Sequence, residues 1–265
     1  GICMKDKEKM RNRIRKNYSD VAQKDLSGGC CSGGCSCDGS SVDVYGSSLK
    51  IGYTLEDVLN APIDSNMGLG CGNPIALANL NEGEVVLDLG SGGGFDSFLA
   101  SKKVGDNGLV IGVDMTPEMV SLARKNAEED GYRNIEFRLG EIEHLPVADE
   151  SVDVIISNCV INLSLDKEQV FKDAYRVLKV GGRLSISDVV ATAELPIEIK
   201  EDLSMMIGCI AGAEFVDNIQ EMMEDAGFKD IKLTPKDNGR EIVKSWVPDR
   251  NVEDYISSYI IEATK

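Results

Sequence analysis

From residue 83 onward, the chain alternates short apolar runs with longer segments whose apolar residues recur every three or four positions. The short runs have the length and composition of buried strands, and the longer segments have the period of helices packed on one face. This alternation predicts a doubly wound α/β fold, with helices on both faces of a mostly parallel sheet. The strands predicted in this region are 85–90, 109–114, 135–139, 152–157 and 183–190.

Residues that favour helix ends bound two of the predicted covering helices. Thr116 is expected to cap a helix that begins at Pro117 and ends just before Gly131. Asp166 is expected to cap another helix, with Gly181 as its stop. Beyond residue 190 the pattern predicts two helices and two more strands, which complete a seven-stranded sheet, at 197–208, 217–226, 231–234 and within 255–263.

The first part of the chain has a different character. Residues 5–24 are typical of a polar helix, and the Gly/Ser-rich stretch 27–41 favours a mobile loop. We therefore expect three parts. Residues 1–61 form an N-terminal helix and Cys-rich mobile segment, 62–190 a nucleoside-binding core, and 191–265 an acceptor-binding extension that completes the sheet.

Charge and hydropathy exclude several classes of partner. The formal net charge is −17, which argues against nucleic acid or an anionic membrane, because phosphate is captured by clustered Lys and Arg. Residues 5–24 carry a net charge of +5, which leaves −22 on the remainder. No window approaches the ~18 consecutive apolar residues of a membrane span, and the N-terminal stretch is charged rather than apolar. We therefore expect a cytoplasmic protein.

A glycine-rich turn follows the first predicted strand, in the motif Asp88-Leu-Gly-Ser-Gly-Gly-Gly94. Glycines let the backbone adopt positive φ and approach a ligand closely. The next strand ends in Asp114, whose carboxylate is placed to accept hydrogen bonds from both hydroxyls of a ribose. The alternative is that Asp88 or Asp114 only caps a turn. A dinucleotide oxidoreductase is disfavoured, because its first turn usually carries three glycines positioned for a pyrophosphate.

The sequence resembles the class I S-adenosylmethionine methyltransferases through that turn, Asp114, the segment Gly140-Glu-Ile-Glu-His-Leu-Pro146 and Leu178-Lys-Val-Gly-Gly-Arg183. The resemblance implies a Rossmann-like fold with S-adenosylmethionine as cofactor. It also implies that the glycine-rich turn borders the methionine part of the cofactor, that Met115 flanks adenine, and that Glu141 meets the polar edge of adenine. The implied cofactor-binding residues are Asp88, Gly90, Ser91, Gly92, Gly94, Asp114, Met115, Glu141, Ile142 and Asn158.

Three of the eight cysteines stand apart in sequence but belong to segments that border the cofactor in such folds. Cys159 follows the fourth predicted strand, in Ser157-Asn-Cys-Val-Ile-Asn-Leu163. Cys71 lies in a glycine-flanked segment before the first strand, and Cys209 lies in a Gly/Ala-rich segment after the fifth. We expect the three to converge on one pocket, and the alternative is that each is a small buried apolar residue.

These segments resemble the arsenite S-adenosylmethionine methyltransferase family, which implies that Cys71, Cys159 and Cys209 bind trivalent arsenic. Arsenic(III) is soft and prefers sulfur, and its lone pair can attack the methyl carbon without a general base, so His144 is expected to have no catalytic role. Two departures from the family are visible. Leu69 replaces a tyrosine of some relatives, and many relatives extend further at the C-terminus.

The clustered cysteines Cys30, Cys31, Cys35 and Cys37 match no usual structural zinc pattern. They are expected to capture arsenic and pass it to the deeper site, or to supply reducing thiols, with Cys30 and Cys31 as the catalytic candidates. The alternative is that they lie in an exposed tail. Cys3 is interpreted as incidental. A thiol reductant such as glutathione or thioredoxin is the expected partner for regeneration, and we expect the glycine-flanked Cys71 to swing into place when arsenite binds.

Two other functions stay open at the level of sequence. One is a methyltransferase of a small organic acceptor, whose activity would survive Cys159→Ser. The other is a non-catalytic metalloid-binding protein, which would bind arsenite without forming adenosylhomocysteine. Antimonite and selenium species are also thiophilic, so the sequence leaves the range of acceptors open.

Overall fold

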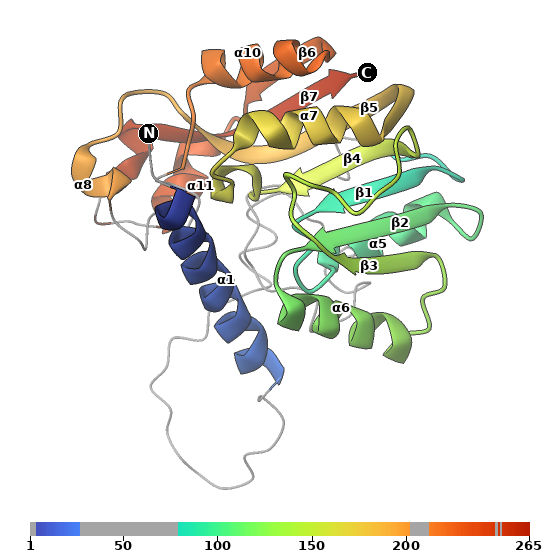
Figure 1. The fold of residues 1–265 in the computed structure, drawn as a ribbon. Coiled ribbons are helices and arrows are strands. Elements are labelled where there is room, and N and C mark those ends of the chain that lie inside the picture. Colours follow the sequence, from blue (N-terminus) through green and yellow to red (C-terminus); the bar gives the residue numbers. More distant parts are fainter. Residues whose placement is uncertain (1–3, 27–78, 202–211, 247–248, 250) are drawn as a thin grey trace, which may run out of the picture.

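The computed structural model describes residues 4–26, 79–201, 212–246, 249 and 251–265, which are organised around one seven-stranded sheet (Figure 1). The strand order is β3-β2-β1-β4-β5-β7-β6. The strands β1 to β5 are parallel, and β7 runs antiparallel to both of its neighbours. The predicted mostly parallel, doubly wound sheet is confirmed. The strands are β1 (Val85–Leu89), β2 (Leu109–Asp114), β3 (Ile135–Leu139), β4 (Val152–Asn158), β5 (Leu178–Ala191), β6 (Lys229–Pro235) and β7 (Ile256–Thr264).

Helices cover both faces of the sheet. On one face α5 (Phe95–Val104), α6 (Pro117–Glu129) and α11 (Gly239–Trp246) pack against the strands, and on the other face lie α7 (Lys167–Val177) and α10 (Val216–Ala226). The remaining described elements are α1 (Met4–Leu26), α8 (Ile197–Lys200), η2 (Ile161–Leu163) and η3 (Val252–Asp254). Among the residues described, no helix has both the length and the apolar character needed to cross a bilayer.

The central strands are apolar at successive positions because both of their faces are covered. Val86 in β1 packs in the cluster with α5, whereas the next residue, Leu87, packs in the cluster with α7. Both side chains are fully buried. A strand between two helical layers has no solvent face, so its sequence becomes a continuous apolar run. This explains why the runs from residue 85 onward predicted the strands well.

The predicted end of the helix at 167–177 was wrong. Asp166 does cap α7, with its carboxylate accepting a bond from the amide of Gln169. The helix ends at Val177, however, because Leu178 becomes extended and buries its side chain in the core. Strand β5 therefore begins at Leu178, and Gly181 lies within it at φ 81°, with its amide bonded to the carbonyl of Lys265.

Helix α11 was missed by the sequence analysis. Among its described side chains, the buried apolar ones are Ile242 and Val243, which are too few for a clear helical period, although α11 packs against β7. The helix predicted at 197–208 is described only as α8, and its remainder lies outside the described residues, as does the predicted loop at 27–41.

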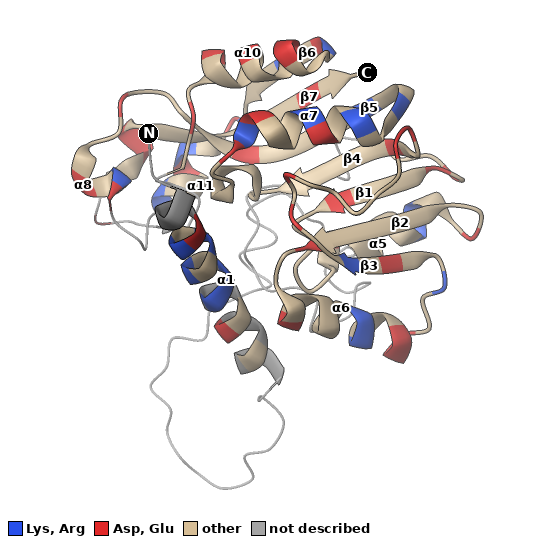
Figure 2. Cartoon of the chain, viewed as in Figure 1, with Lys and Arg blue, Asp and Glu red and all other residues tan. Residues whose placement is uncertain are grey.

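The helix α1 lies against α6 and is rich in Lys and Arg, which Figure 2 shows in blue. Arg11 contacts Glu141 at 3.2 Å and Glu143 at 4.0 Å, and Arg15 contacts Glu141 at 3.6 Å. Ile14, between the two arginines, is buried. Apolar burial and ion pairing therefore both hold α1 beside the segment that follows β3.

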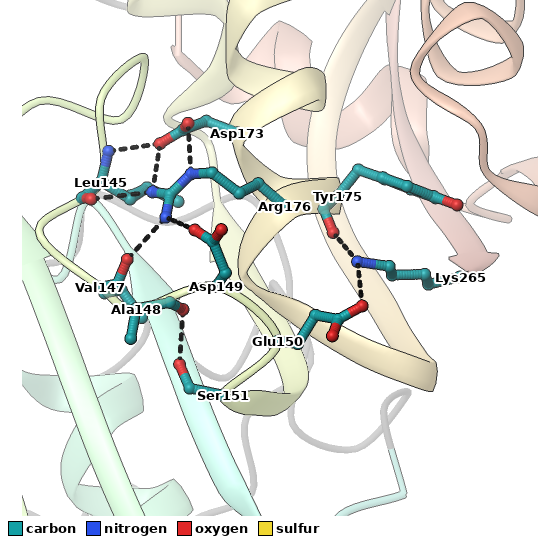
Figure 3. Close-up of polar contacts among 10 residues, drawn as sticks. All are labelled: Leu145, Val147, Ala148, Asp149, Glu150, Ser151, Asp173, Tyr175, Arg176 and Lys265. Atoms are coloured by element: carbon teal, nitrogen blue, oxygen red, sulfur yellow. Dashed lines mark hydrogen bonds and ion pairs between the residues drawn. The ribbon is translucent and has the colours of Figure 1, made fainter.

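Arg176 ties the loop between β3 and β4 to α7 (Figure 3). Its guanidinium donates to the carbonyls of Leu145 and Val147, at 3.0 and 2.8 Å, and forms ion pairs with Asp173 and Asp149. The bonds to these two carboxylates raise the pKa of Arg176. One side chain thus bonds two backbone carbonyls of this loop and two carboxylates at once.

We expect Arg176→Met to lower the free energy of unfolding by about 2 kcal/mol, because two carbonyls and two carboxylates each lose one hydrogen-bond donor. Chemical denaturation followed by circular dichroism measures the loss. Arg240→Met is the matched control, since its ion pair with Asp254 is exposed on both sides and is worth less than about 1 kcal/mol. Equal losses in the two variants would contradict this role for Arg176.

Candidate active site

The order of the strands reverses between β1 and β4, and the predicted site lies at that point. These two strands are parallel neighbours with Leu89 opposite Ser157. In an open α/β sheet, the crevice at the carboxyl ends of the strands beside such a reversal is where ligands bind. Gly90 directly follows β1 and Cys159 directly follows β4, so the predicted cofactor turn and the predicted arsenic ligand begin at adjacent strand ends.

The glycine-rich turn has a backbone that other residues rarely adopt. Gly90, Gly92 and Gly94 have φ values of 66°, 52° and 98°. The amides of Gly90 and Ser91 both donate to the carbonyl of Val113 in β2, at 2.8 and 3.0 Å. The turn is therefore fastened to β2, and its glycines are required by conformation.

Asp114, at the end of β2, holds the glycine-rich turn from the other side. One carboxylate oxygen accepts a bond from the amide of Gly92 at 3.0 Å, and the other accepts one from the amide of Thr116 at 2.9 Å. Burial raises the pKa of Asp114, and these two bonds oppose the rise. Asp114 thus does close a turn, yet a carboxylate has about four acceptor positions, so its bonds within the turn still leave room for a ligand.

This geometry also corrects the predicted cap of α6. The helix begins at Pro117 with Thr116 at the N-cap position, as expected, but the Thr116 side chain makes no cap hydrogen bond. Its hydroxyl instead bonds to Asp114, because the preceding carboxylate is the stronger acceptor.

Three carboxylates gather around the glycine-rich turn. Asp88 is buried and accepts a bond from the hydroxyl of Ser97 at 2.6 Å. Burial raises the pKa of Asp88 well above its usual range, and the charges of Asp96 and Asp114 add to the rise while the Ser97 bond opposes it. Such a site favours a cationic ligand and disfavours a pyrophosphate.

The other predicted cofactor residues border the same region. Met115 is half-buried beside Asp114, and Ile142 packs against the core. The Asn158 side chain donates to Asp96 at 3.3 Å. Glu141 forms an ion pair with Arg11 of α1. It also forms an isolated β-bridge with His144, which is exposed. None of these contacts tests a role in cofactor binding, so these assignments stay predictions.

The turn after β1 and the turn after β4 are in direct contact. A Cβ atom built on Gly90 would overlap the side chain of Val160. Val160 is the residue after Cys159, so the backbone of Cys159 is held beside the glycine-rich turn. The sequence analysis missed this role of Val160 and the acidic contribution of Asp96. In the sequence Val160 is one residue of the motif around Cys159, and Asp96 is a residue near the start of a helix. Neither position indicates the contact that the structure shows.

Of the predicted thiol residues, the structure describes Cys159 alone. Its side chain is buried, its φ is 57°, and its sulfur is in a disulfide bond. The other predicted cysteines also lie outside the described residues, and they are Cys3, Cys30, Cys31, Cys35, Cys37, Cys71 and Cys209. No cluster of metal-ligating side chains is found among the described residues.

Comparison with known proteins shows which family shares this arrangement. A family model described as a methyltransferase domain matches residues 80–227. The arsenite methyltransferase of Halobacterium salinarum is 47% identical over 276 aligned residues, which cover 100% of this chain and 68% of that protein. The chain belongs to the arsenite methyltransferase family.

Other members of the arsenite methyltransferase family are similar over shorter stretches. Arsenite methyltransferase of Homo sapiens is 41% identical over 168 residues, covering 60% of this chain and 44% of that protein. The crystal structure of an arsenic(III) S-adenosylmethionine methyltransferase from Chlamydomonas reinhardtii has 33% identity and a TM-score of 0.62, and the match covers 84% of this chain and 73% of that one. Phosphoethanolamine N-methyltransferase 2 of Haemonchus contortus shares the fold, at 19% identity and a TM-score of 0.63 over 80% of this chain and 60% of that one.

Membership in the arsenite methyltransferase family confirms two predictions, the class I fold and an S-adenosylmethionine-dependent methyltransferase. The chain spans 68% of the Halobacterium protein and about half the length of the curated relatives from Aquipseudomonas alcaligenes, Mus musculus and Rattus norvegicus. The roles of individual site residues stay predictions.

We expect Gly90→Ala to weaken binding of S-adenosylmethionine at least about tenfold, because the new methyl group displaces Val160 or shifts the turn. Isothermal titration calorimetry measures this affinity. Gly131→Ala is the matched control, since Gly131 has a similar φ of 70° but no atom within 4 Å of an added Cβ. It should lose about 1 kcal/mol of stability and keep its affinity. An affinity loss shared by both variants would assign the effect to the backbone conformation alone.

Proposed function

We propose that this protein, once the disulfide of Cys159 has been reduced, transfers the methyl group of S-adenosylmethionine to trivalent arsenic bound by the thiolates of Cys71, Cys159 and Cys209. The observation that supports this most directly is the contact between Gly90 and Val160. It holds the backbone of Cys159 against the glycine-rich turn, which is the predicted binding site of the methionine part of the cofactor. The acceptor atom on Cys159 and the methyl donor would then be neighbours.

The charges around the turn suit this methyl donor. S-adenosylmethionine supplies a methyl group on a cationic sulfonium, next to a cationic amino group. Asp88, Asp96 and Asp114 surround the turn that would receive these charges. Their attraction supports a sulfonium ligand over a dinucleotide, whose pyrophosphate is anionic. The predicted hydrogen bonds of Asp114 to ribose would use the acceptor positions left by Gly92 and Thr116.

Sulfur ligation suits the acceptor. Three thiolates form a pyramidal complex with arsenic(III), whose lone pair points away from the sulfurs. The lone pair forms the new arsenic–carbon bond as the carbon–sulfonium bond breaks, and the bonding electrons return to sulfur as adenosylhomocysteine leaves. No proton moves in this step, so the protein mainly positions the two reactants, which in well-aligned cases is worth ~7 kcal/mol or more.

Regeneration of the trivalent state would need a thiol reductant. Methyl transfer raises the formal oxidation state of arsenic by two, and oxidation of two thiols to a disulfide returns the two electrons. We propose glutathione or a thioredoxin-type protein as the source, with Cys30 and Cys31 as thiols that capture arsenic or take part in reduction. A cytoplasmic location agrees with this need for reduced thiols.

The division at residues 61 and 190 into N-terminal segment, cofactor core and arsenic-binding extension is part of the same proposal.

We expect Cys159→Ser to lower adenosylhomocysteine formation with arsenite, S-adenosylmethionine and a thiol reductant at least about 100-fold, because a hydroxyl binds arsenic(III) far more weakly than a thiolate. Cys71→Ser and Cys209→Ser should behave in the same way. The affinity for S-adenosylmethionine, measured by calorimetry, should change less than about twofold in each variant.

Cys3→Ser is the matched control, and its turnover should equal that of the wild type. Turnover that does not require arsenite, or that survives Cys159→Ser, would point instead to a small organic acceptor. Tight arsenite binding without adenosylhomocysteine would point to a metalloid-binding protein that lacks catalysis.

A further inference from the structure

The backbone of Cys159 is held in an unfavourable conformation. Its φ of 57° lies in the left-handed region, which L-residues with a side chain rarely occupy. Such a conformation persists only where surrounding contacts enforce it, and it is often found at functional sites. The contacts that enforce it here come from β5, the next strand of the sheet.

Strand β5 holds both ends of the turn that carries Cys159. The amide of Cys159 donates to the carbonyl of Ser187 at 2.8 Å. Two residues further along the turn, the amide of Ile161 donates to the carboxylate of Asp188 at 3.0 Å. The other oxygen of Asp188 accepts a bond from the side chain of Asn162 at 3.1 Å. Asp188 thus closes the turn from within the core, where its side chain is 1% exposed.

Asn162 connects the same turn to a third segment of the chain. Its side-chain amide also donates to the carbonyl of Val189 at 2.6 Å, which fixes the residue in place. A Cβ atom on Gly212 would overlap the carbonyl oxygen of Asn162. Gly212 has no positive φ, so a glycine is needed there for close approach rather than for conformation. In the sequence, Gly212 follows Cys209 by three residues.

The segment after Gly212 is fastened to the same strand. The amide of Ala191, the last residue of β5, donates to the carbonyl of Glu214 at 2.9 Å, and Ala191 forms a parallel bridge with Phe215. The turn containing Cys159 and the segment that begins three residues after Cys209 are therefore both attached to the carboxyl end of β5.

We propose that Asp188, Asn162 and Gly212 form a positioning cluster, which holds the Cys159 turn in its strained shape and docks the segment that follows Cys209 against it. The cluster would set the spacing between two of the sulfur ligands before arsenic arrives. This inference rests on the proposed function. None of the three residues would touch arsenic or the cofactor, so each acts through the cysteines.

The cost of burying Asp188 supports a role beyond stability. Burial raises its pKa to about 7, although the amides of Val189 and Ile161 and the charge of Lys167 lower it. A buried carboxylate whose pKa is raised destabilises the folded state when it is ionised. An apolar residue would avoid that cost but would leave the amide of Ile161 and the side chain of Asn162 without their acceptor.

The test compares Asp188→Asn and Gly212→Ala with two controls near the amino ends of β4 and β5. Asp153→Asn alters a carboxylate that also accepts a backbone amide, that of Val85. Gly182→Ala fills a similarly crowded site without positive φ, against the carbonyl of Lys179. Arsenite binding by the reduced proteins is followed by the ultraviolet absorbance of arsenic–sulfur bonds. S-adenosylmethionine binding is followed by calorimetry, and the KM for arsenite and kcat are measured separately.

We expect Asp188→Asn and Gly212→Ala to raise the Kd and KM for arsenite at least about tenfold and to leave the Kd for S-adenosylmethionine within about twofold. The two controls should shift neither affinity. Unchanged arsenite affinity in the two variants would overturn the positioning cluster and leave the proposed function intact. Parallel losses of both ligands would also overturn it, since they indicate general unfolding. A wild-type protein that binds no arsenite would overturn the proposed function itself.

Discussion

The ends of β1 and β4 approach so closely that only a hydrogen atom fits between the backbone of Gly90 and the side chain of Val160. The parallel register of the two strands, with Leu89 opposite Ser157, sets this approach. Because the sheet itself fixes both turns, the glycine-rich turn and the Cys159 turn cannot move independently. In the proposed function the methyl donor and the arsenic ligand Cys159 would lie on these two turns, so the sheet would position the two reactants.

The sequence predicted the strands well and the helix ends less well, for physical reasons. A strand such as β1 is apolar on both faces because helices cover both, and this is visible in Val85 to Leu89. Asp166 caps α7 through a bond to a residue three positions away, which is local and therefore predictable. The end of α7 depends on where Leu178 finds space in the core, and α11 depends on packing against β7. Both are tertiary effects.

The features of the candidate site that could be predicted also depend on local sequence, and those that could not depend on contacts between distant residues. The positive φ of Gly90, Gly92 and Gly94 could be predicted, because a recurring spacing of glycines marks this turn in the sequence. The contacts of Asp188 and Gly212 were not found, since each meets the Cys159 turn across at least 26 residues of chain. Cys159 was identified by its motif, yet nothing in that motif indicated a left-handed backbone.

The insertion of β7 between β5 and β6 has a consequence for biosynthesis. β7 pairs with β5 over nine residues and with β6 on its other side. Until residues 256–264 have left the ribosome, β5 is an open sheet edge and β6 has no neighbour. Open edges invite pairing with other chains. The edge of β5, the strand that holds the Cys159 turn, is thus covered only after β7 has been made.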